Sequence, residues 1–192
     1  MEWVMKTNED LFPHLDFNTD KGWGYLPPTD EVLDVFRYVK SECNPERILE
    51  IGYYAGHSTS YLAEIMPGTD IISCCPNHPM YRDTVLRVER KYRYVKVIGV
   101  KSPEIFEYIC DWTFDFAFVD GSHHKKPVMM DVALCLTMGV KWILFDNADQ
   151  QEVQEGIAPY MHRLEQVKEW QYTGVNKGKT RVNSITLFRV KG

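Results

Sequence analysis

The sequence has no hydrophobic run that approaches the roughly 20 apolar residues of a membrane-spanning helix. Its N-terminal segment also has no apolar stretch of the kind that secretory signal peptides contain. We therefore expect a cytoplasmic protein that does not contact a membrane.

Positive charge is in deficit, because 22 lysine and arginine residues stand against 27 aspartate and glutamate residues. Without a basic stripe, we do not expect nucleic acid as a partner. The five cysteines form no CxxC pair and no cysteine–histidine spacing typical of zinc sites. Their odd number is typical of free thiols in a reducing compartment.

A chain of 192 residues is long enough for one domain with a buried core. Residues 1–28 are rich in proline and glycine, and we interpret them as an N-terminal extension of a single domain over residues 29–192. Thr29 is the expected cap of the first helix, because two acidic residues and an apolar face follow it.

Short apolar segments then alternate with helical patterns, which predicts an α/β fold whose parallel sheet has helices on both faces. The closing segment has two strand patterns without a helix between them, which predicts an antiparallel hairpin. Together these patterns predict a doubly wound, mostly parallel sheet of seven strands. The five strands expected before the hairpin are 47–51, 70–75, 94–100, 114–120 and 141–146, and the helices after them are 58–66, 79–92, 102–110, 126–136 and 151–168.

The segment EIGYYAGHS, residues 50–58, joins the first strand to the next helix. Ligands of doubly wound sheets bind at the carboxyl ends of the strands, where glycines let the backbone approach a ligand closely. The spacing from Gly52 to Gly56 is not the GxGxxG fingerprint, so a dinucleotide is disfavoured. A turn that merely connects strand and helix would explain the glycines as well.

This segment resembles the first motif of class I S-adenosylmethionine (SAM)-dependent methyltransferases, and its form ExGxYxGxS is most similar to the catechol O-methyltransferase branch. The resemblance implies a Rossmann-like methyltransferase fold with SAM as cofactor. It also implies that Gly52 and Gly56 flank the methionine part of SAM, that Ser58 starts the helix beneath it, and that Glu50 orders the loop. Tyr54 is an implied cofactor contact.

The same resemblance implies three further cofactor contacts, from Cys75, Ser102 and Asp120. Cys75 stands where the family has an acidic residue that grips the ribose hydroxyls, and a thiol cannot replace a carboxylate in that role. This departure motivates an alternative hypothesis, in which the chain is a catalytically inactive methyltransferase-like binding or interaction module.

Acidic residues end the fourth and fifth expected strands. Asp120, Asp146 and Asn147 supply oxygen donors at neighbouring strand ends, a set that suits Mg²⁺. The arrangement looks like the metal site of catechol O-methyltransferases and favours it over the alternative, in which each aspartate only caps the element that follows it.

The position of the family's catalytic lysine holds His123 here, and Lys125 is the second candidate for a general base. The closing hairpin has a basic turn, residues 176–181, where the catechol branch needs an acid. The predicted activity is therefore metal-assisted O-methylation of a small, hydroxylated, acidic molecule.

Overall fold

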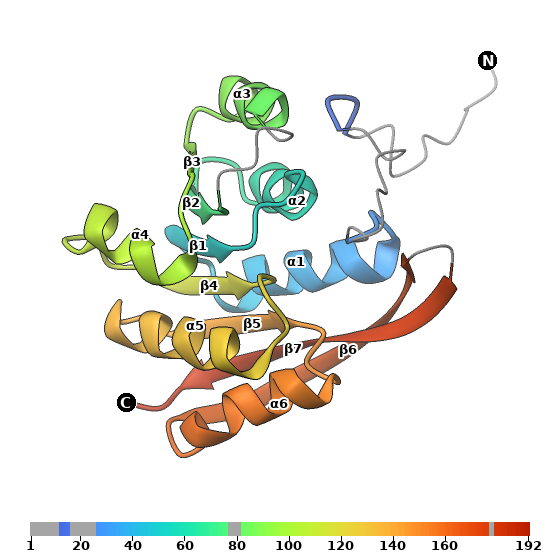
Figure 1. Cartoon of the computed structure of the whole chain (residues 1–192). Coiled ribbons are helices and arrows are strands. Elements are labelled where there is room, and N and C mark those ends of the chain that lie inside the picture. The colour runs from blue at the N-terminus through green and yellow to red at the C-terminus, as the bar shows by residue number, and fades with distance from the viewer. Residues whose placement is uncertain (1–11, 16–25, 77–81, 177–178) are drawn as a thin grey trace.

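The chain folds into a seven-stranded sheet with helices on both faces (Figure 1). The computed structural model describes residues 12–15, 26–76, 82–176 and 179–192. The strand order is β3-β2-β1-β4-β5-β7-β6, and β7 runs antiparallel to both of its neighbours. The elements are α1 (Asp30–Glu42), β1 (Arg47–Ile51), α2 (His57–Ile65), β2 (Asp70–Cys74), α3 (Arg82–Lys91), β3 (Val95–Ile98), α4 (Ser102–Ile109), β4 (Phe116–Val119), α5 (Lys125–Thr137), β5 (Trp142–Asp146), α6 (Gln151–Ile157), a 3₁₀ turn (Ala158–Tyr160), β6 (Leu164–Asn176) and β7 (Lys179–Val190). The predicted doubly wound fold with a closing antiparallel hairpin is confirmed.

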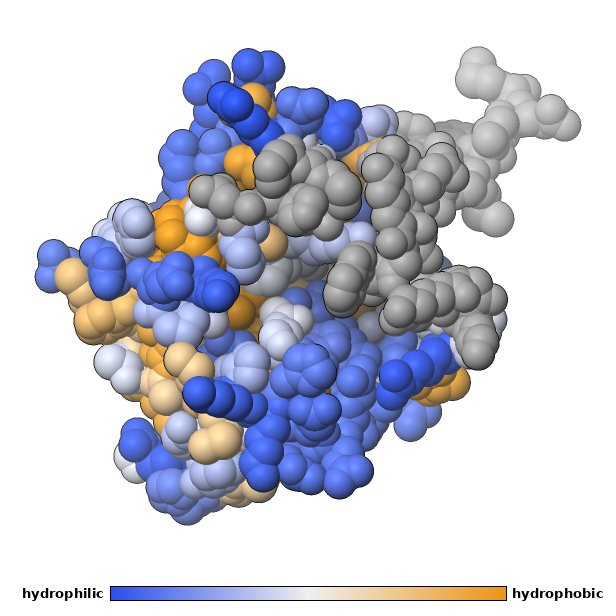
Figure 2. All heavy atoms as spheres, in the orientation of Figure 1, coloured by the Kyte–Doolittle hydropathy of each residue, from blue (hydrophilic) through white to orange (hydrophobic). Residues whose placement is uncertain are grey.

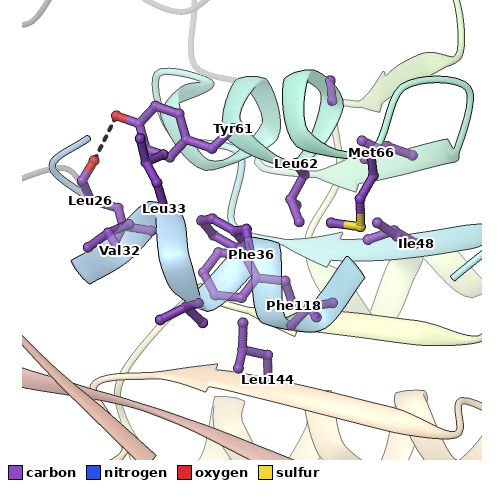
Figure 3. Close-up of a cluster of buried hydrophobic side chains, with 14 of the residues drawn as sticks. Leu26, Val32, Leu33, Phe36, Ile48, Tyr61, Leu62, Met66, Phe118 and Leu144 are labelled. Atoms are coloured by element: carbon purple, nitrogen blue, oxygen red, sulfur yellow. Dashed lines mark hydrogen bonds between the residues drawn. The ribbon is translucent and has the colours of Figure 1, made fainter. Parts of the chain in front are cut away.

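The helix α1 begins as its sequence predicts. The Thr29 hydroxyl accepts a hydrogen bond from the backbone N–H of Val32, and two acidic residues occupy the first turn. Its apolar face is fully buried and packs with α2 against β1, β4 and β5 (Figure 3). The Tyr61 hydroxyl, on α2, donates a hydrogen bond to the Leu26 carbonyl (Figure 3). Residues just before α1 are thereby held against the core.

Two hydrophobic cores lie on opposite faces of the sheet. The first is formed with α1, α2 and α3, and it includes Phe12 and Leu15 from the N-terminal segment. The second is formed with α4, α5 and α6. Because both faces are covered, β1 and β4 are buried along almost their whole length, which explains the continuous apolar sequence of β4.

The point at which the strand order reverses determines where the candidate site lies. From β1 the chain proceeds outward through β2 and β3, and it then returns to the other side of β1 for β4 and β5. In such sheets the crevice lies outside the carboxyl ends of the strands at the point of reversal. The loops after β1 and β4 therefore meet there.

The prediction of one long helix over residues 151–168 is wrong. The helix α6 ends at Ile157, and the chain forms a 3₁₀ turn before β6 begins at Leu164. Pro159 has no backbone N–H with which to continue the helical hydrogen bonds. Leu164 is instead buried against the second core, and Glu165 faces its cross-strand partner Arg189, with 2.6 Å between the carboxylate and guanidinium groups.

Within the described residues, no helix is long and apolar enough to cross a membrane. Figure 2 shows hydrophobic side chains gathered over α4 and α5, whereas the surface over α6 is mainly hydrophilic. The exposed large apolar side chains of α4, α5 and the turn after α4 are Phe106, Tyr108, Trp112 and Met130.

Candidate active site

The loop after β1 contacts the loop after β4 through backbone atoms. Gly52 has a φ of +112°, and a Cβ added to it would lie 2.0 Å from the carbonyl oxygen of Asp120. The Asp120 N–H donates a hydrogen bond of 2.8 Å to the Ile51 carbonyl. Gly56 caps α2 with a φ of +80°, and Tyr54 between the two glycines also has a positive φ, of +44°. The glycines are therefore required for this loop to reach the strand edge.

Glu50 is fully buried at the end of β1, and its carboxylate holds the first turn of α2. The Ser58 hydroxyl donates a 2.7 Å hydrogen bond to one carboxylate oxygen, and the Thr59 hydroxyl donates to the other. Burial raises the pKa of Glu50, and these hydrogen bonds partly offset that rise. The expected role of Glu50 in ordering the loop agrees with this geometry, and Thr59 is a partner that the sequence did not single out.

Cys75 follows β2 at the same edge of the sheet and is partly buried. Burial raises the pKa of its thiol, and hydrogen bonds from the backbone N–H groups of Tyr54 and Tyr53 oppose that rise. The cysteine therefore lies beside the glycine loop, at the place where the ribose-binding position was expected.

Ser102, at the start of α4, turns its hydroxyl toward the core. The hydroxyl donates a hydrogen bond to Asp131 on α5. Asp131 is 1% exposed, and burial raises its pKa to about 6. Ser102 thus ties the loop after β3 to α5, and Asp131 is a buried polar residue that no sequence motif indicated.

Asp120, His123 and Asp146 form a compact cluster at the ends of β4 and β5. Each offers one potential ligand atom, and these atoms lie within 4.8 Å of one another. The His123 Nε2 atom lies 3.4 Å from a carboxylate oxygen of Asp120 and, within the described residues, is buried without a hydrogen-bond partner. Burial raises the pKa of Asp120 to about 7, and burial together with the nearby Asp120 carboxylate raises the pKa of Asp146 well above its usual range.

The Asp146 carboxylate is held on both oxygens. The Tyr172 hydroxyl, from β6, donates a 2.9 Å hydrogen bond to Oδ1, and the Asn147 side chain donates to Oδ2. The Asn147 oxygen accepts a 2.7 Å hydrogen bond from Gln150. Asn147 also adopts a φ of +55°, which asparagine tolerates. The expected metal ligand Asn147 therefore presents its N–H group to Asp146 instead of an oxygen to the cluster.

Lys125 is not part of this cluster. Its ammonium group is exposed and pairs with Glu155 on α6 at 3.2 Å. The neighbouring His124 pairs with Glu152 at 3.1 Å. Of the two expected bases, the structure brings only His123 to the carboxylates.

The comparisons with known proteins agree on one family. The methyltransferase domain family matches residues 49–148, just over half of the chain. Catechol O-methyltransferase B of Danio rerio is 32% identical over 114 residues, which cover 55% of this chain and 42% of that protein. The match thus spans less than half the length of that relative.

Solved structures of O-methyltransferases share the fold. The O-methyltransferase from Bacillus cereus in complex with SAH has a TM-score of 0.65 and 21% identity, and the alignment covers 88% of this chain and 84% of that chain. TomG from Streptomyces achromogenes, in complex with SAM, has a TM-score of 0.63 and 16% identity, with 85% and 81% covered. Identities this low establish the architecture alone.

Proposed function

Because this chain belongs to the methyltransferase domain family, we propose that it is a SAM-dependent O-methyltransferase that uses a divalent cation and a small hydroxylated substrate. The observation that carries the proposal is the shared position of the glycine loop and the Asp120–His123–Asp146 cluster. Both lie at the carboxyl edge of the sheet, and the backbone contact between Gly52 and Asp120 joins them.

The glycine loop is the proposed cofactor site. The backbone of Gly52, Tyr54 and Gly56 would lie close to SAM. The hydrogen bond between Glu50 and Ser58 would hold the loop in its conformation. Cys75 would lie at the ribose without the charge-assisted hydrogen bonds that a carboxylate provides. Such bonds contribute about 1.5–3 kcal/mol each, so their absence should weaken SAM binding by about tenfold or more.

The donor set of the cluster fits a divalent cation. Two carboxylates face one another in a buried setting that disfavours their charged forms, and an enclosed imidazole nitrogen lies beside them without a hydrogen bond. A cation held by Asp120 and Asp146 would compensate both charges, and oxygen donors suit Mg²⁺. When bound, the cation would supply Lewis-acid stabilisation of a substrate oxygen.

The protein's own contribution is alignment and proton transfer. Methyl transfer requires the nucleophile, the methyl group and the sulfur in line, with water excluded. His123 is the group that would take the substrate's hydroxyl proton, because its imidazole lies at the carboxylate cluster with an Nε2 atom that has no hydrogen-bond partner among the described residues. An acidic substrate would have to compete with Asp149 for Arg181, the exposed hairpin cation that lies 3.7 Å from the Asp149 carboxylate.

Calorimetric titration with SAM and with S-adenosylhomocysteine, each with and without Mg²⁺, tests the proposed function. We expect binding of both nucleosides at micromolar concentration and turnover that depends on the cation. If neither compound binds under either condition, the inactive binding module motivated by Cys75 becomes the better description.

The two candidate bases differ in their expected sensitivity to substitution. His123→Ala should lower kcat by about 10²–10⁴-fold, the usual contribution of general-base catalysis, and leave S-adenosylhomocysteine affinity unchanged. Lys125→Ala is the matched control in the same segment, because its ammonium group pairs with Glu155 at the surface. Equal activity of the two variants would remove His123 from the role of base.

A further inference from the structure

We infer, on the premise of the proposed function, that Tyr172 is a positioning residue that fixes the Asp146 carboxylate for the cation. The closing hairpin would then complete the metal site, although the two carboxylates that would hold the cation, Asp120 and Asp146, lie outside the hairpin. Neither the glycine motif nor the strand-end aspartates indicated this tyrosine.

The path from Tyr172 to Asp146 crosses one intervening strand. Asp146 pairs with Ile185 on β7, and Tyr172 on β6 pairs with Asn183, two residues along β7. The tyrosine side chain therefore reaches over β7 to place its hydroxyl 2.9 Å from Asp146 Oδ1. The side chain belongs to the first hydrophobic core and is almost fully buried.

The surroundings of the ring restrict its movement. Gly174 lies two residues further along β6, and a Cβ at that position would approach the Tyr172 ring to 3.4 Å and the Asn183 amide to 2.8 Å. The close approach of the β6 backbone at Gly174, together with the near-complete burial of the ring in the first core, limits the room in which the ring can move. A hydroxyl held in this way has little freedom to leave Asp146.

A second donor acts on the other oxygen of the same carboxylate. The Asn147 side chain donates a hydrogen bond to Asp146 Oδ2, and the Gln150 side chain donates one to the Asn147 side-chain oxygen. A carboxylate that is hydrogen-bonded on both oxygens keeps one orientation, so less conformational freedom is lost when it binds a cation. Outer-shell partners of this kind typically change metal affinity by 10–100-fold when they are removed.

A purely structural role makes a different prediction. If the hydroxyl serves only to satisfy a buried carboxylate, its removal should lower the melting temperature without changing how tightly the cation binds. Metal affinity and the electron paramagnetic resonance spectrum of bound Mn²⁺ therefore separate the two roles, independently of catalytic activity.

The experiment compares Tyr172→Phe with Tyr92→Phe. Tyr92 is a matched control, because its hydroxyl donates a 2.7 Å hydrogen bond to Glu64, a tyrosine–carboxylate pair between α3's end and α2. With S-adenosylhomocysteine present, we expect Tyr172→Phe to bind Mn²⁺ about 10–100-fold more weakly than wild type and to alter its resonance spectrum. Tyr92→Phe should match wild type in both measurements.

Two results would overturn the inference in distinguishable ways. A Tyr172→Phe protein that binds Mn²⁺ within about twofold of wild type would show that the hydroxyl does not position Asp146, while the metal site itself stands. A wild-type protein that binds S-adenosylhomocysteine but no Mn²⁺ would remove both the cation and the role of Tyr172. Failure to bind the nucleoside would instead count against the proposed methyltransferase function.

Discussion

Asp146→Asn should abolish measurable cation binding and lower turnover by about 10²–10³-fold, because a catalytic cation contributes several kcal/mol of transition-state stabilisation. The substitution removes one of the two carboxylates of the cluster and changes the shape of the side chain very little. Its oxygen can still accept the hydrogen bond from Tyr172. Affinity for S-adenosylhomocysteine should stay at the wild-type value, since the glycine loop is unchanged.

The matched control for this substitution is Asp70→Asn. Asp70 is a half-exposed aspartate at the amino end of β2, on the opposite edge of the sheet, and its carboxylate lies 3.9 Å from the Arg47 guanidinium group. Turnover, calorimetric metal affinity and melting temperature should all remain at wild-type values in this control. Wild-type turnover in Asp146→Asn would contradict the metal-assisted mechanism and leave a metal-independent methyltransferase as the description.

Gly52→Ala should destabilise the protein strongly, because its Cβ would clash with the loop after β4. An added Cβ would lie 2.0 Å from a backbone oxygen, and the φ of +112° is strained for any residue with a side chain. Backbone strain and the clash together should lower the free energy of unfolding by about 3 kcal/mol, or roughly 6–12 °C in melting temperature. SAM affinity should fall as well, because the loop would have to move away from Asp120.

The control variant Gly68→Ala measures the cost of backbone strain at a positive φ without a steric clash. Gly68 has a φ of +87°, and a Cβ at that position would meet nothing within 4 Å. We expect a loss of about 1–2 kcal/mol from strain alone, with cofactor affinity unchanged. If thermal denaturation shows equal losses for the two alanine variants, the contact between Gly52 and Asp120 does not hold the two loops together.

Local sequence patterns were sufficient for the elements that build the sheet. The strand predicted over residues 47–51 is β1 itself, and the alternation of strands and helices led to the observed layers. Such patterns succeed because the burial of a strand or a helix face depends on the spacing of apolar residues along one segment. The same reasoning failed after Ile157, where the mostly polar residues 165–169, all of them exposed, belong to the edge strand β6 and not to a helix.

The sequence by itself determined which chemistry-bearing residues come to the carboxyl edge, because Asp120 and Asp146 each end a parallel strand. Only the tertiary structure decided their partners. Whether Lys125 faces the cluster or Glu155, and whether Ser102 faces outward or binds Asp131, depends on how helices pack. Tyr172 reaches Asp146 across 26 residues of chain, through the register of β5, β7 and β6. Register and packing are set by the whole core, so no local pattern specifies them.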